Sequence, residues 1–149
     1  MNGSIFLDTN VVVYAYDRSE SFKQSKIVPV LDELSSIGAG ALSTQVLCEL
    51  FVALTSKIRS PLSQKDGVQR VERHMQIWTV LNVTSVIILE ALRGVRKHHF
   101  SFWDSLVWAT AKLNQISIIF SEDFADGSTV EGVRFVNPFN EAFELSEWL

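Results

Sequence analysis

Cysteine is almost absent from this sequence, and so are the features that mark exported or membrane-spanning chains. Cys48 is the only cysteine among 149 residues, so no disulfide can form within the chain. The sequence does not open with a basic segment followed by an apolar run, and no apolar stretch approaches about 18 residues. We therefore expect a cytoplasmic protein with neither a secretory signal nor a membrane-spanning helix.

Positive charge is also scarce. The chain carries 13 Lys and Arg against 17 Asp and Glu, which gives a formal net charge of -4. Taken alone, this balance argues against a nucleic-acid partner, because phosphate binding generally requires a basic surface. Hydrophobic residues make up 47% and charged residues only 20%, so the chain is expected to fold. The apolar excess indicates either a large core or a surface that a partner covers.

Short apolar segments alternate with longer amphipathic ones along the chain. The short segments are typical of buried strands, and the long ones repeat apolar residues at helical spacing. The length suits a single domain, which we expect to span residues 1–149. The predicted strands are 4–7, 41–43, 82–83, 117–120 and 133–136, and the predicted helices are 21–37, 44–57 (capped by Thr44), 64–78, 85–99 and 101–114.

Strands separated by helices in this order predict an α/β fold, a three-layer sandwich in which helices flank a mostly parallel central sheet. In such sheets, functional residues gather beyond the carboxyl ends of the strands. Asp8 follows the first predicted strand and Asp123 follows the strand at 117–120. This edge of the sheet is therefore the predicted location of a functional site.

Two further acidic residues lie within apolar helix faces. Glu49 has Val46 three residues before it and Ala53 four residues after it, and Asp104 has Trp108 four residues after it. A buried carboxylate without a partner is costly or becomes protonated. Most Lys and Arg residues lie on polar helix faces, which makes a divalent cation the simpler partner for these acids.

The chemistry of the donors indicates which cation would suit them. Several carboxylates without a nearby histidine or thiol form a hard oxygen site, which favours Mg²⁺ or Mn²⁺ over zinc. His98 and His99 are adjacent and His74 is remote from them. Neither an H-E-x-x-H nor a C-x-x-C pattern occurs, so the sequence offers no zinc motif.

Each acid also has a purely structural interpretation. Asp8 could cap the helix that follows the first strand, and Ser101 with Asp104 has the spacing of a capping box. The acidic stretch 121–127 could be a simple turn. Glu49 is the hardest to explain in this way. A metal site is absent only if all four structural interpretations hold together.

Four segments carry these acids in a specific order. They are I-F-L-D-T-N-V-V-V-Y at the start, S-T-Q-V-L-C-E-L-F in the middle, F-W-D-S-L-V-W-A-T-A late in the chain, and I-I-F-S-E-D-F followed by V-N-P-F. Together they span nearly the whole chain. In this order they resemble the PIN domain family, and in particular its small VapC-type ribonuclease toxins of type II toxin–antitoxin systems. The resemblance implies a PIN-like fold with a parallel sheet flanked by helices.

The resemblance also implies a site and an activity. Acids in this family hold Mg²⁺ or Mn²⁺, and the matching residues here are Asp8, Glu49, Asp104 and Asp123. The implied reaction is metal-dependent hydrolysis of RNA phosphodiester bonds by an endoribonuclease, in which the acids hold metal and do not attack. Asp8 and Asp104 are the predicted direct ligands, and Glu49 and Asp123 complete the cluster or act through water.

The fourth acid is the least certain of the set. Glu122 and Asp126 compete with Asp123 for this role, because all three lie in one short stretch. Asn10 and Ser121 match polar positions beside the family's acids. With four acids assigned to metal, the rest of the surface is close to neutral, so RNA binding should depend on metal and on a local basic rim.

Other functions remain open from the sequence. A catalytically silent PIN-like module that binds RNA or a protein partner is the main alternative. Haloacid-dehalogenase-like phosphatases also place an Asp after a strand, but they need a second Asp where this chain has Asn10. A response-regulator receiver would leave Glu49 unexplained.

Substrate and protein partners can be predicted only in outline. Trp103 and Trp108 could stack on RNA bases, although aromatic residues in helices usually belong to the core. The resemblance implies a cognate antitoxin that blocks the site and a homodimer, and the apolar composition is compatible with both. The basic candidates for RNA contact are Lys57, Arg59, Arg70, Arg73, Arg93, Arg96 and Lys97.

Overall fold

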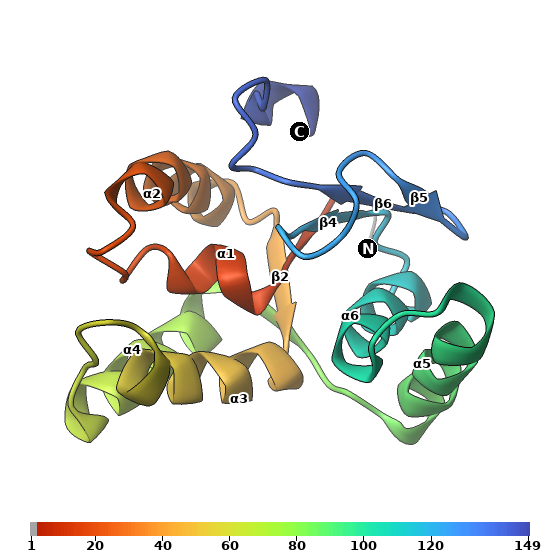
Figure 1. Ribbon diagram of the computed structural model, residues 1–149, viewed down its shortest axis with the longest axis horizontal. Helices are drawn as coiled ribbons and strands as arrows, with labels where there is room; N and C mark the ends of the chain where they lie inside the picture. The colour runs from red at the N-terminus through yellow and green to blue at the C-terminus, as the bar shows by residue number, and fades with distance from the viewer. Residues whose placement is uncertain (1–2) are drawn as a thin grey trace.

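A computed structural model describes residues 3–149 and contains a sheet with the strand order β3-β2-β1-β4-β6-β5 (Figure 1). All neighbouring strands pair in parallel except β5 and β6, which are antiparallel. The mostly parallel sheet is therefore confirmed. Residues 1 and 2 of the predicted 1–149 range lie outside the described residues. The strands are β1 (Ile5–Leu7), β2 (Gly40–Ser43), β3 (Thr79–Leu81), β4 (Ile118–Phe120), β5 (Thr129–Val130) and β6 (Val133–Val136).

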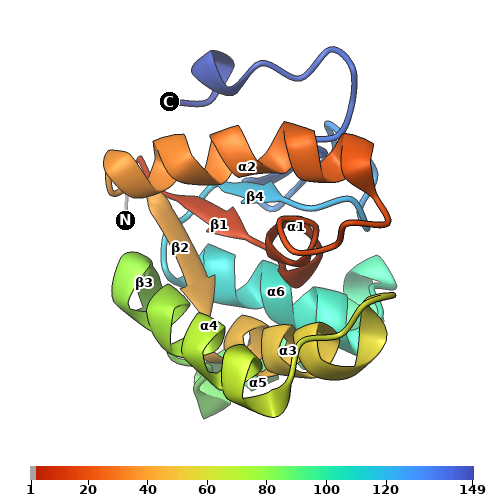
Figure 2. The same cartoon turned by 90° about the vertical axis from the view of Figure 1, so that its left-hand side faces the viewer.

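Helices connect the parallel strands and form the outer layers. Figure 2 shows α2 on one side of the strands and α3, α4, α5 and α6 on the other, so the three-layer arrangement is confirmed. Within residues 3–149, no helix is long and apolar enough to cross a membrane. The helices are α1 (Thr9–Val13), α2 (Ser21–Ser36), α3 (Thr44–Val52), α4 (Gln64–Ile77), α5 (Ser85–His98), α6 (Phe102–Leu113), the π-helical η1 (Ala53–Lys57) and the 3₁₀ turn η2 (Leu145–Glu147).

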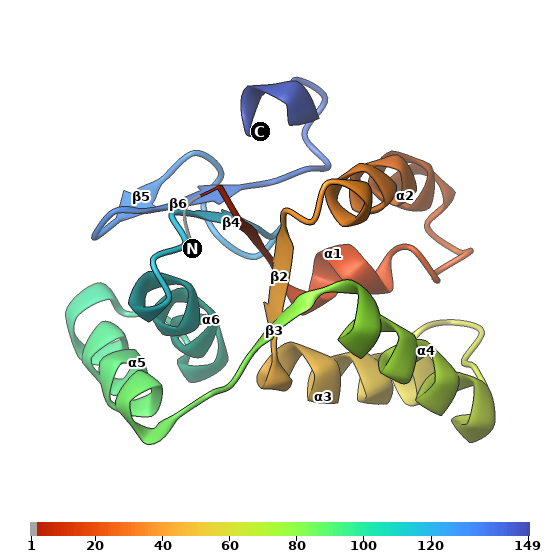
Figure 3. The same ribbon diagram turned by 180° about the vertical axis from the view of Figure 1, so that it is seen from behind.

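The helices on the second side form two pairs. Seen from behind, α3 and α4 lie together at the lower right, and α5 and α6 lie together at the lower left (Figure 3). Helices α5 and α6 approach closely at Gly94, where a Cβ atom would overlap the Ser105 hydroxyl and the Trp108 ring. The Ser105 hydroxyl donates to the Ala91 carbonyl at 2.6 Å. This contact fixes the position of α6, which carries Asp104.

A buried histidine ties α4 to the segment that follows α1. The indole N–H of Trp78 donates to His74 Nδ1 at 2.8 Å, and His74 Nε2 lies 2.6 Å from the Tyr16 hydroxyl. Since an indole N–H can only donate, neutral His74 holds its proton on Nε2 and donates to Tyr16. Burial, together with the charges of Arg73 and Arg70, lowers the pKa of His74 to about 4. His74 is therefore a structural residue.

Strand β3 and the cap of α3 both differ from the prediction. Strand β3 ends before the predicted 82–83 segment, because its pairing with β2 extends only from Thr79 to Leu81. The cap of α3 is Ser43, one residue before the predicted Thr44, and its hydroxyl accepts from the Val46 N–H at 3.2 Å. The Thr44 hydroxyl instead accepts from the Val83 N–H at 3.2 Å, which joins the start of α3 to the chain after β3.

Candidate metal centre

Asp8 stands at the carboxyl end of β1 and is buried. One of its oxygens accepts from the Thr9 N–H at 2.8 Å, so Asp8 caps α1, and the other accepts from the Ser121 hydroxyl at 2.7 Å. Burial raises the pKa of Asp8 to about 7, and the nearby charges of Asp123 and Glu49 add to this effect. The fold therefore keeps a carboxylate in a place where its negative charge is strongly disfavoured.

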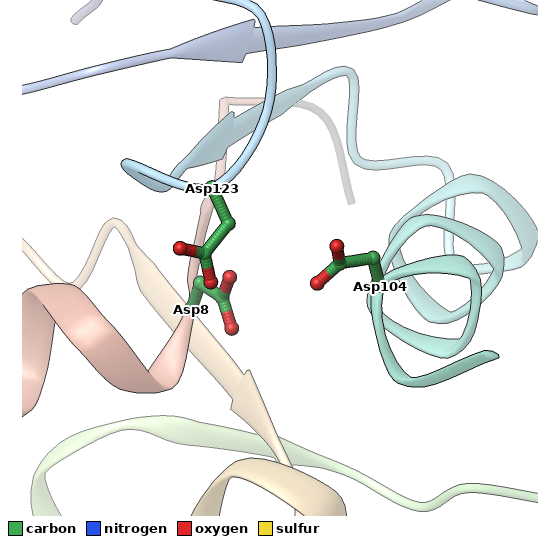
Figure 4. Close-up of side chains that lie close together, drawn as sticks. All are labelled: Asp8, Asp104 and Asp123. Carbon is green, nitrogen blue, oxygen red and sulfur yellow. The ribbon is translucent and has the colours of Figure 1, made fainter. Parts of the chain in front are cut away.

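Asp104 and Asp123 join Asp8 from two other elements. Asp104 lies in the first turn of α6, where its N–H donates to the Ser101 hydroxyl at 3.3 Å, and Asp123 lies in the loop after β4. One oxygen of each of the three carboxylates lies within 4.8 Å of the others. Figure 4 shows the three side chains pointing toward one another. We call Asp8, Asp104 and Asp123 the three-aspartate cluster.

The electrostatics of the cluster disfavour three negative charges. Burial raises the pKa of Asp104, and the charges of Asp123 and Glu49 raise it further. Asp104 is half-buried and Asp123 is exposed, so the cluster opens to solvent on one side. Among residues 3–149, no Lys or Arg forms an ion pair with any of the three aspartates. Within this part of the chain no basic side chain balances the three aspartates, so a bound cation would relieve their repulsion.

Two polar side chains cross-link the cluster. The Asn10 amide donates to Asp123 at 3.0 Å and to the Ser121 hydroxyl at 3.2 Å, and it lies 3.4 Å from Asp8. The Asp123 N–H donates to the Ser121 hydroxyl at 3.1 Å. Both residues match the polar positions that the sequence indicated beside the acids. They hold the end of β1 and the loop after β4 at a fixed separation.

Glu49 lies outside the three-aspartate cluster but lines the same cavity, which has a volume of about 1020 Å³. We call this cavity the cleft; all four predicted acids line it. Glu49 accepts from the Thr9 hydroxyl at 3.1 Å and from the Gln45 amide at 2.6 Å. Both of its oxygens are thus held by neutral donors, and the carboxylate faces the same space as the aspartates.

The two competing acids have other partners. Glu122 accepts from the Tyr14 hydroxyl at 2.6 Å and from Lys23 at 2.7 Å. Asp126 accepts from the Asn137 N–H at 2.8 Å and from the Asn140 amide at 2.9 Å. Neither residue lines the cleft. Of the three acids in this stretch, the structure brings Asp123 to Asp8.

The donor set fits a hard divalent cation. Three carboxylate oxygens converge, and the cleft is lined by no histidine. Carboxylate oxygens suit Mg²⁺, Mn²⁺ or Ca²⁺, whereas zinc usually takes nitrogen or sulfur ligands. Cys48 lines the cleft, but it does not belong to the group of three converging ligands. The three-aspartate cluster could therefore hold such a cation, with Glu49 close by.

The predicted RNA-contacting residues separate into two groups. Lys57 and Trp103 line the cleft. Trp108, by contrast, is fully buried and donates to the Val130 carbonyl at 3.2 Å, so its predicted role in stacking on bases is wrong. Arg93 is engaged by Glu90 and Glu131. The candidates that do not line the cleft are Arg59, Arg70, Arg73, Arg93, Arg96 and Lys97.

Sequence reasoning missed the side chains that orient the acids. Gln45 and Thr9 hold Glu49, while Tyr14 and Lys23 hold Glu122 next to Asp123. A signal existed for Gln45, because it precedes Glu49 by four residues and so shares its helix face. No sequence signal links Lys23 to Glu122, because 99 residues separate them.

The fold and the cluster together define an α/β protein with a carboxylate site at the carboxyl edge of a parallel sheet. The sequence model of the PIN domain matches residues 5–125. The chain therefore belongs to the PIN domain family, as its sequence segments indicated. No sequence among curated proteins matches the chain significantly.

Solved structures share this fold at low sequence identity. VapC20 of Mycobacterium tuberculosis, described as a Sarcin-Ricin loop cleaving toxin, is 22% identical, with a TM-score of 0.64 over 88% of this chain and 99% of that one. FitAB bound to a DNA fragment is 18% identical, with a TM-score of 0.69 over 93% and 98%. DNA-bound VapBC of Salmonella typhimurium is 16% identical, with a TM-score of 0.63 over 89% and 96%. These likenesses establish a common fold.

Proposed function

We propose that this protein is a metal-dependent endoribonuclease and the toxin of a type II toxin–antitoxin pair. The observation that carries the proposal is the three-aspartate cluster, in which three carboxylates converge without a Lys or Arg partner among residues 3–149. Membership of the PIN domain family and a fold shared with an RNA-cleaving toxin support the same conclusion. We further propose that residues 1–149 act as a single PIN-like domain in the cytoplasm.

The proposed chemistry rests on acids that hold a cation. Asp8 and Asp104 would hold Mg²⁺ or Mn²⁺ directly, and Asp123 and Glu49 would complete the site or act through water. When bound, such an ion lowers the pKa of water and neutralises charge on the phosphate. Asn10 positions Asp123 against Asp8. Thr9 and Gln45 orient the Glu49 carboxylate toward the cleft.

A cognate antitoxin and a homodimer are the proposed protein partners. One similar structure is a toxin–antitoxin complex from Klebsiella pneumoniae. Large apolar side chains are exposed along α5, which is compatible with a covered surface. They are Val86 (63% exposed), Leu89 (67%) and Leu92 (48%). Gel filtration tests the dimer, and co-purification with the product of a neighbouring short gene tests the antitoxin.

The nuclease activity is tested with Asp104→Asn. We expect the wild type to cleave RNA only when Mg²⁺ or Mn²⁺ is present, and the variant to be at least about 100-fold slower. Cleavage is followed on single-stranded RNA with added metal and with EDTA. Asp32→Asn is the matched control, because Asp32 is exposed on α2 and lies outside the cleft.

Two outcomes would contradict the proposal in different ways. Equal, metal-independent cleavage by the wild type and by Asp104→Asn would exclude the cluster as the catalytic site. A thermal shift with Mn²⁺ but no cleavage of any RNA would instead favour a silent module that binds RNA or a partner. The two results are distinguishable because thermal shift reports cation binding without turnover.

A further inference from the structure

The cleft runs along one face of α3 and η1. The residues that line it from this segment recur every three or four positions, as the same face of a helix requires. From residue 44 to residue 57, a helix of this length extends roughly 20 Å. Figure 1 shows α6 near the start of α3, and α1 above α3. The lining residues of this face are Thr44, Gln45, Cys48, Glu49, Val52, Ala53 and Lys57.

Trp103 stands at the α6 end of the cleft, directly before Asp104 in the chain. Its side chain is 62% exposed, whereas Trp78 and Trp108 are buried. Its ring meets the Phe102 ring edge-on, with 5.1 Å between the centroids. An indole that is mostly in water beside a carboxylate site leaves a large apolar face available to a ligand.

The backbone of Trp103 is held by Gln45 of α3. The Gln45 side chain is about nine-tenths buried, and its amide nitrogen donates to Glu49 at 2.6 Å and to the Trp103 carbonyl at 3.3 Å. Because both of these neighbours are acceptors, the orientation of the amide is fixed. Its oxygen, Oε1, is the one buried side-chain polar atom without a hydrogen bond in the described part of the chain. The amide N–H bonds of Gln45 thus tie the start of α6, which carries Trp103, to Glu49 on α3.

The opposite end of the cleft carries a positive charge. Lys57, at the end of η1, is the one Lys or Arg among the residues that line the cleft within the described chain. Apolar side chains such as Val52, Ile58 and Val83 also line the cleft. The cleft thus combines an aromatic platform, an apolar wall, a carboxylate cluster and a cation.

We propose that Trp103 forms a nucleobase-binding subsite, on which one base of a single-stranded RNA substrate stacks beside the three-aspartate cluster. The inference rests on the proposed ribonuclease function and specifies how the substrate is held. Stacking on an aromatic ring is the usual way in which proteins bind the unpaired bases of RNA. A backbone phosphate farther along the strand meets Lys57.

The location of Trp103 favours an RNA base over a protein side chain as the group that binds its ring. The indole is continuous with the acid cluster, since Trp103 and Asp104 are adjacent residues and line the same cleft. A strand whose phosphate reaches the cluster necessarily places the neighbouring nucleotides along the walls of the cleft. Lys57 adds the charge that attracts a polyanion, whereas the apolar residues exposed on α5 lie outside the cleft.

The subsite is tested by comparing Trp103→Ala and Trp103→Phe with the wild type. On a single-stranded RNA that the wild type cleaves, Trp103→Ala should raise KM by about 5- to 100-fold and change kcat much less, because the variant removes base stacking. Trp103→Phe keeps an aromatic face and should recover most of the loss. Phe22→Ala is the matched control, because Phe22 is an aromatic residue on α2 that is 58% exposed outside the cleft, and the variant should leave KM unchanged.

An abasic scan of the substrate identifies the base that stacks. Each nucleotide near the cleaved bond is replaced in turn by an abasic residue. One position should raise KM for the wild type by a similar factor, and the same replacement should cost Trp103→Ala nothing further. This non-additivity is specific to a contact between the ring and that base, and a general loss of folding would not produce it.

The outcomes separate this subsite from the proposed function. Wild-type protein that cleaves no RNA would overturn the ribonuclease proposal, and the subsite with it. A wild type that cleaves RNA, with an unchanged KM for Trp103→Ala, would overturn the subsite alone. The same holds if Trp103→Ala weakens self-association or antitoxin binding while KM for RNA stays constant, because Trp103 would then contact a protein.

Discussion

The protein contains two groups of acidic side chains, and they are neutralised in opposite ways. Glu90 and Glu131, at the junction of α5, α6 and the β5–β6 turn, are surrounded by cations. Arg93 contacts Glu131 at 2.7 Å, Lys112 contacts Glu90 at 2.9 Å, and His98 lies 2.5 Å from Glu131. The three-aspartate cluster has no such partner among the described residues. It occurs at the carboxyl edge of the sheet, where α/β folds usually place their sites.

The pKa values express the same difference. Hydrogen bonds from Arg93 and His98 lower the pKa of Glu131 to about 2. Burial raises the pKa of Asp8 to about 7. The first group stabilises the folded chain when it is ionised, whereas ionisation of the second group opposes folding unless a cation is bound. The neutralised group is therefore structural, and the other is suited to chemistry.

The largest expected effect comes from Asp8→Asn, which removes one charge from the cluster. We expect RNA cleavage to fall by at least about 100-fold, because a ligand of the cation is lost. The free energy of unfolding in EDTA should stay the same or rise, since the repulsion between carboxylates decreases while the side-chain oxygen still accepts from Thr9. Urea unfolding and a cleavage assay on the same preparation measure both quantities.

One result for Asp8→Asn would contradict this difference between the two groups of acids. If Asp8→Asn lowers the free energy of unfolding and lowers cleavage only in proportion to the unfolded fraction, Asp8 is a helix cap and no more. Asn is itself a good cap, so a loss of stability is not expected from capping alone.

The sequence was sufficient to predict the elements that bring the acids together. Asp8 and Asp123 follow strands whose apolar runs are short and clearly bounded, and parallel strands place their carboxyl ends at one edge. Asp104 could be recognised because an acid in an apolar helix face needs a partner. These inferences depend on local patterns, and the structure brings Asp8, Asp104 and Asp123 within 4.8 Å.

Other features depend on contacts that no local pattern reports. The two-residue strand β5 is too short for a periodic signal, and it forms only because it pairs with β6. Trp108 shares its helix with Trp103, yet one is buried under Arg93 and Lys112 and the other faces the cleft. Spacing along α6 could not decide between them, because the packing of α5 against α6 sets which face is covered.

The choice among the three acids of the loop also required tertiary contacts. Lys23 pairs with Glu122 across 99 residues of sequence, and this contact holds Glu122 outside the cleft. For Glu49, the sequence indicated that a partner was needed but did not indicate which residues would be that partner. Its apolar neighbours indicated a partner, and the partners that the structure provides are Thr9 and Gln45, with the aspartates farther away.

A smaller effect is expected from Glu122→Gln, which separates positioning from cation binding. Lys23 and Tyr14 hold Glu122 in place, and Glu122 directly precedes Asp123. Loss of the ion pair should loosen this loop and lower kcat by about 10-fold, at the weaker end of what lost supporting contacts cost a metal site. The Mn²⁺ concentration that gives half-maximal cleavage should rise as well, which a loss of folded protein would not cause.

A double-variant cycle distinguishes this positioning role from an independent one. In an Asp123→Asn background, Glu122→Gln should have no further effect on kcat, because the group that it positions is gone. Additive losses would show that Glu122 acts apart from Asp123, and the contrast between paired and unpaired acids would then fail within this loop.

The smallest effect is expected from Glu131→Gln, which removes a charge from the neutralised group. Near pH 7, the melting temperature should fall by about 2–4 °C while cleavage per folded molecule stays unchanged, because the network is partly exposed and lies outside the cleft.

The pKa of Glu131 is lower in the folded state than its ordinary value of 4.5, so its contribution is complete above pH 4.5. This contribution is lost as the pH falls from 4.5 toward 2, and the wild type and the variant should therefore melt at nearly the same temperature only near pH 2. Glu72→Gln is the control, since Glu72 is exposed on α4 and forms no ion pair among the described residues. A difference between wild type and Glu131→Gln that persists unchanged at low pH would mean that the side chain stabilises the β5–β6 turn by its shape and not by its charge.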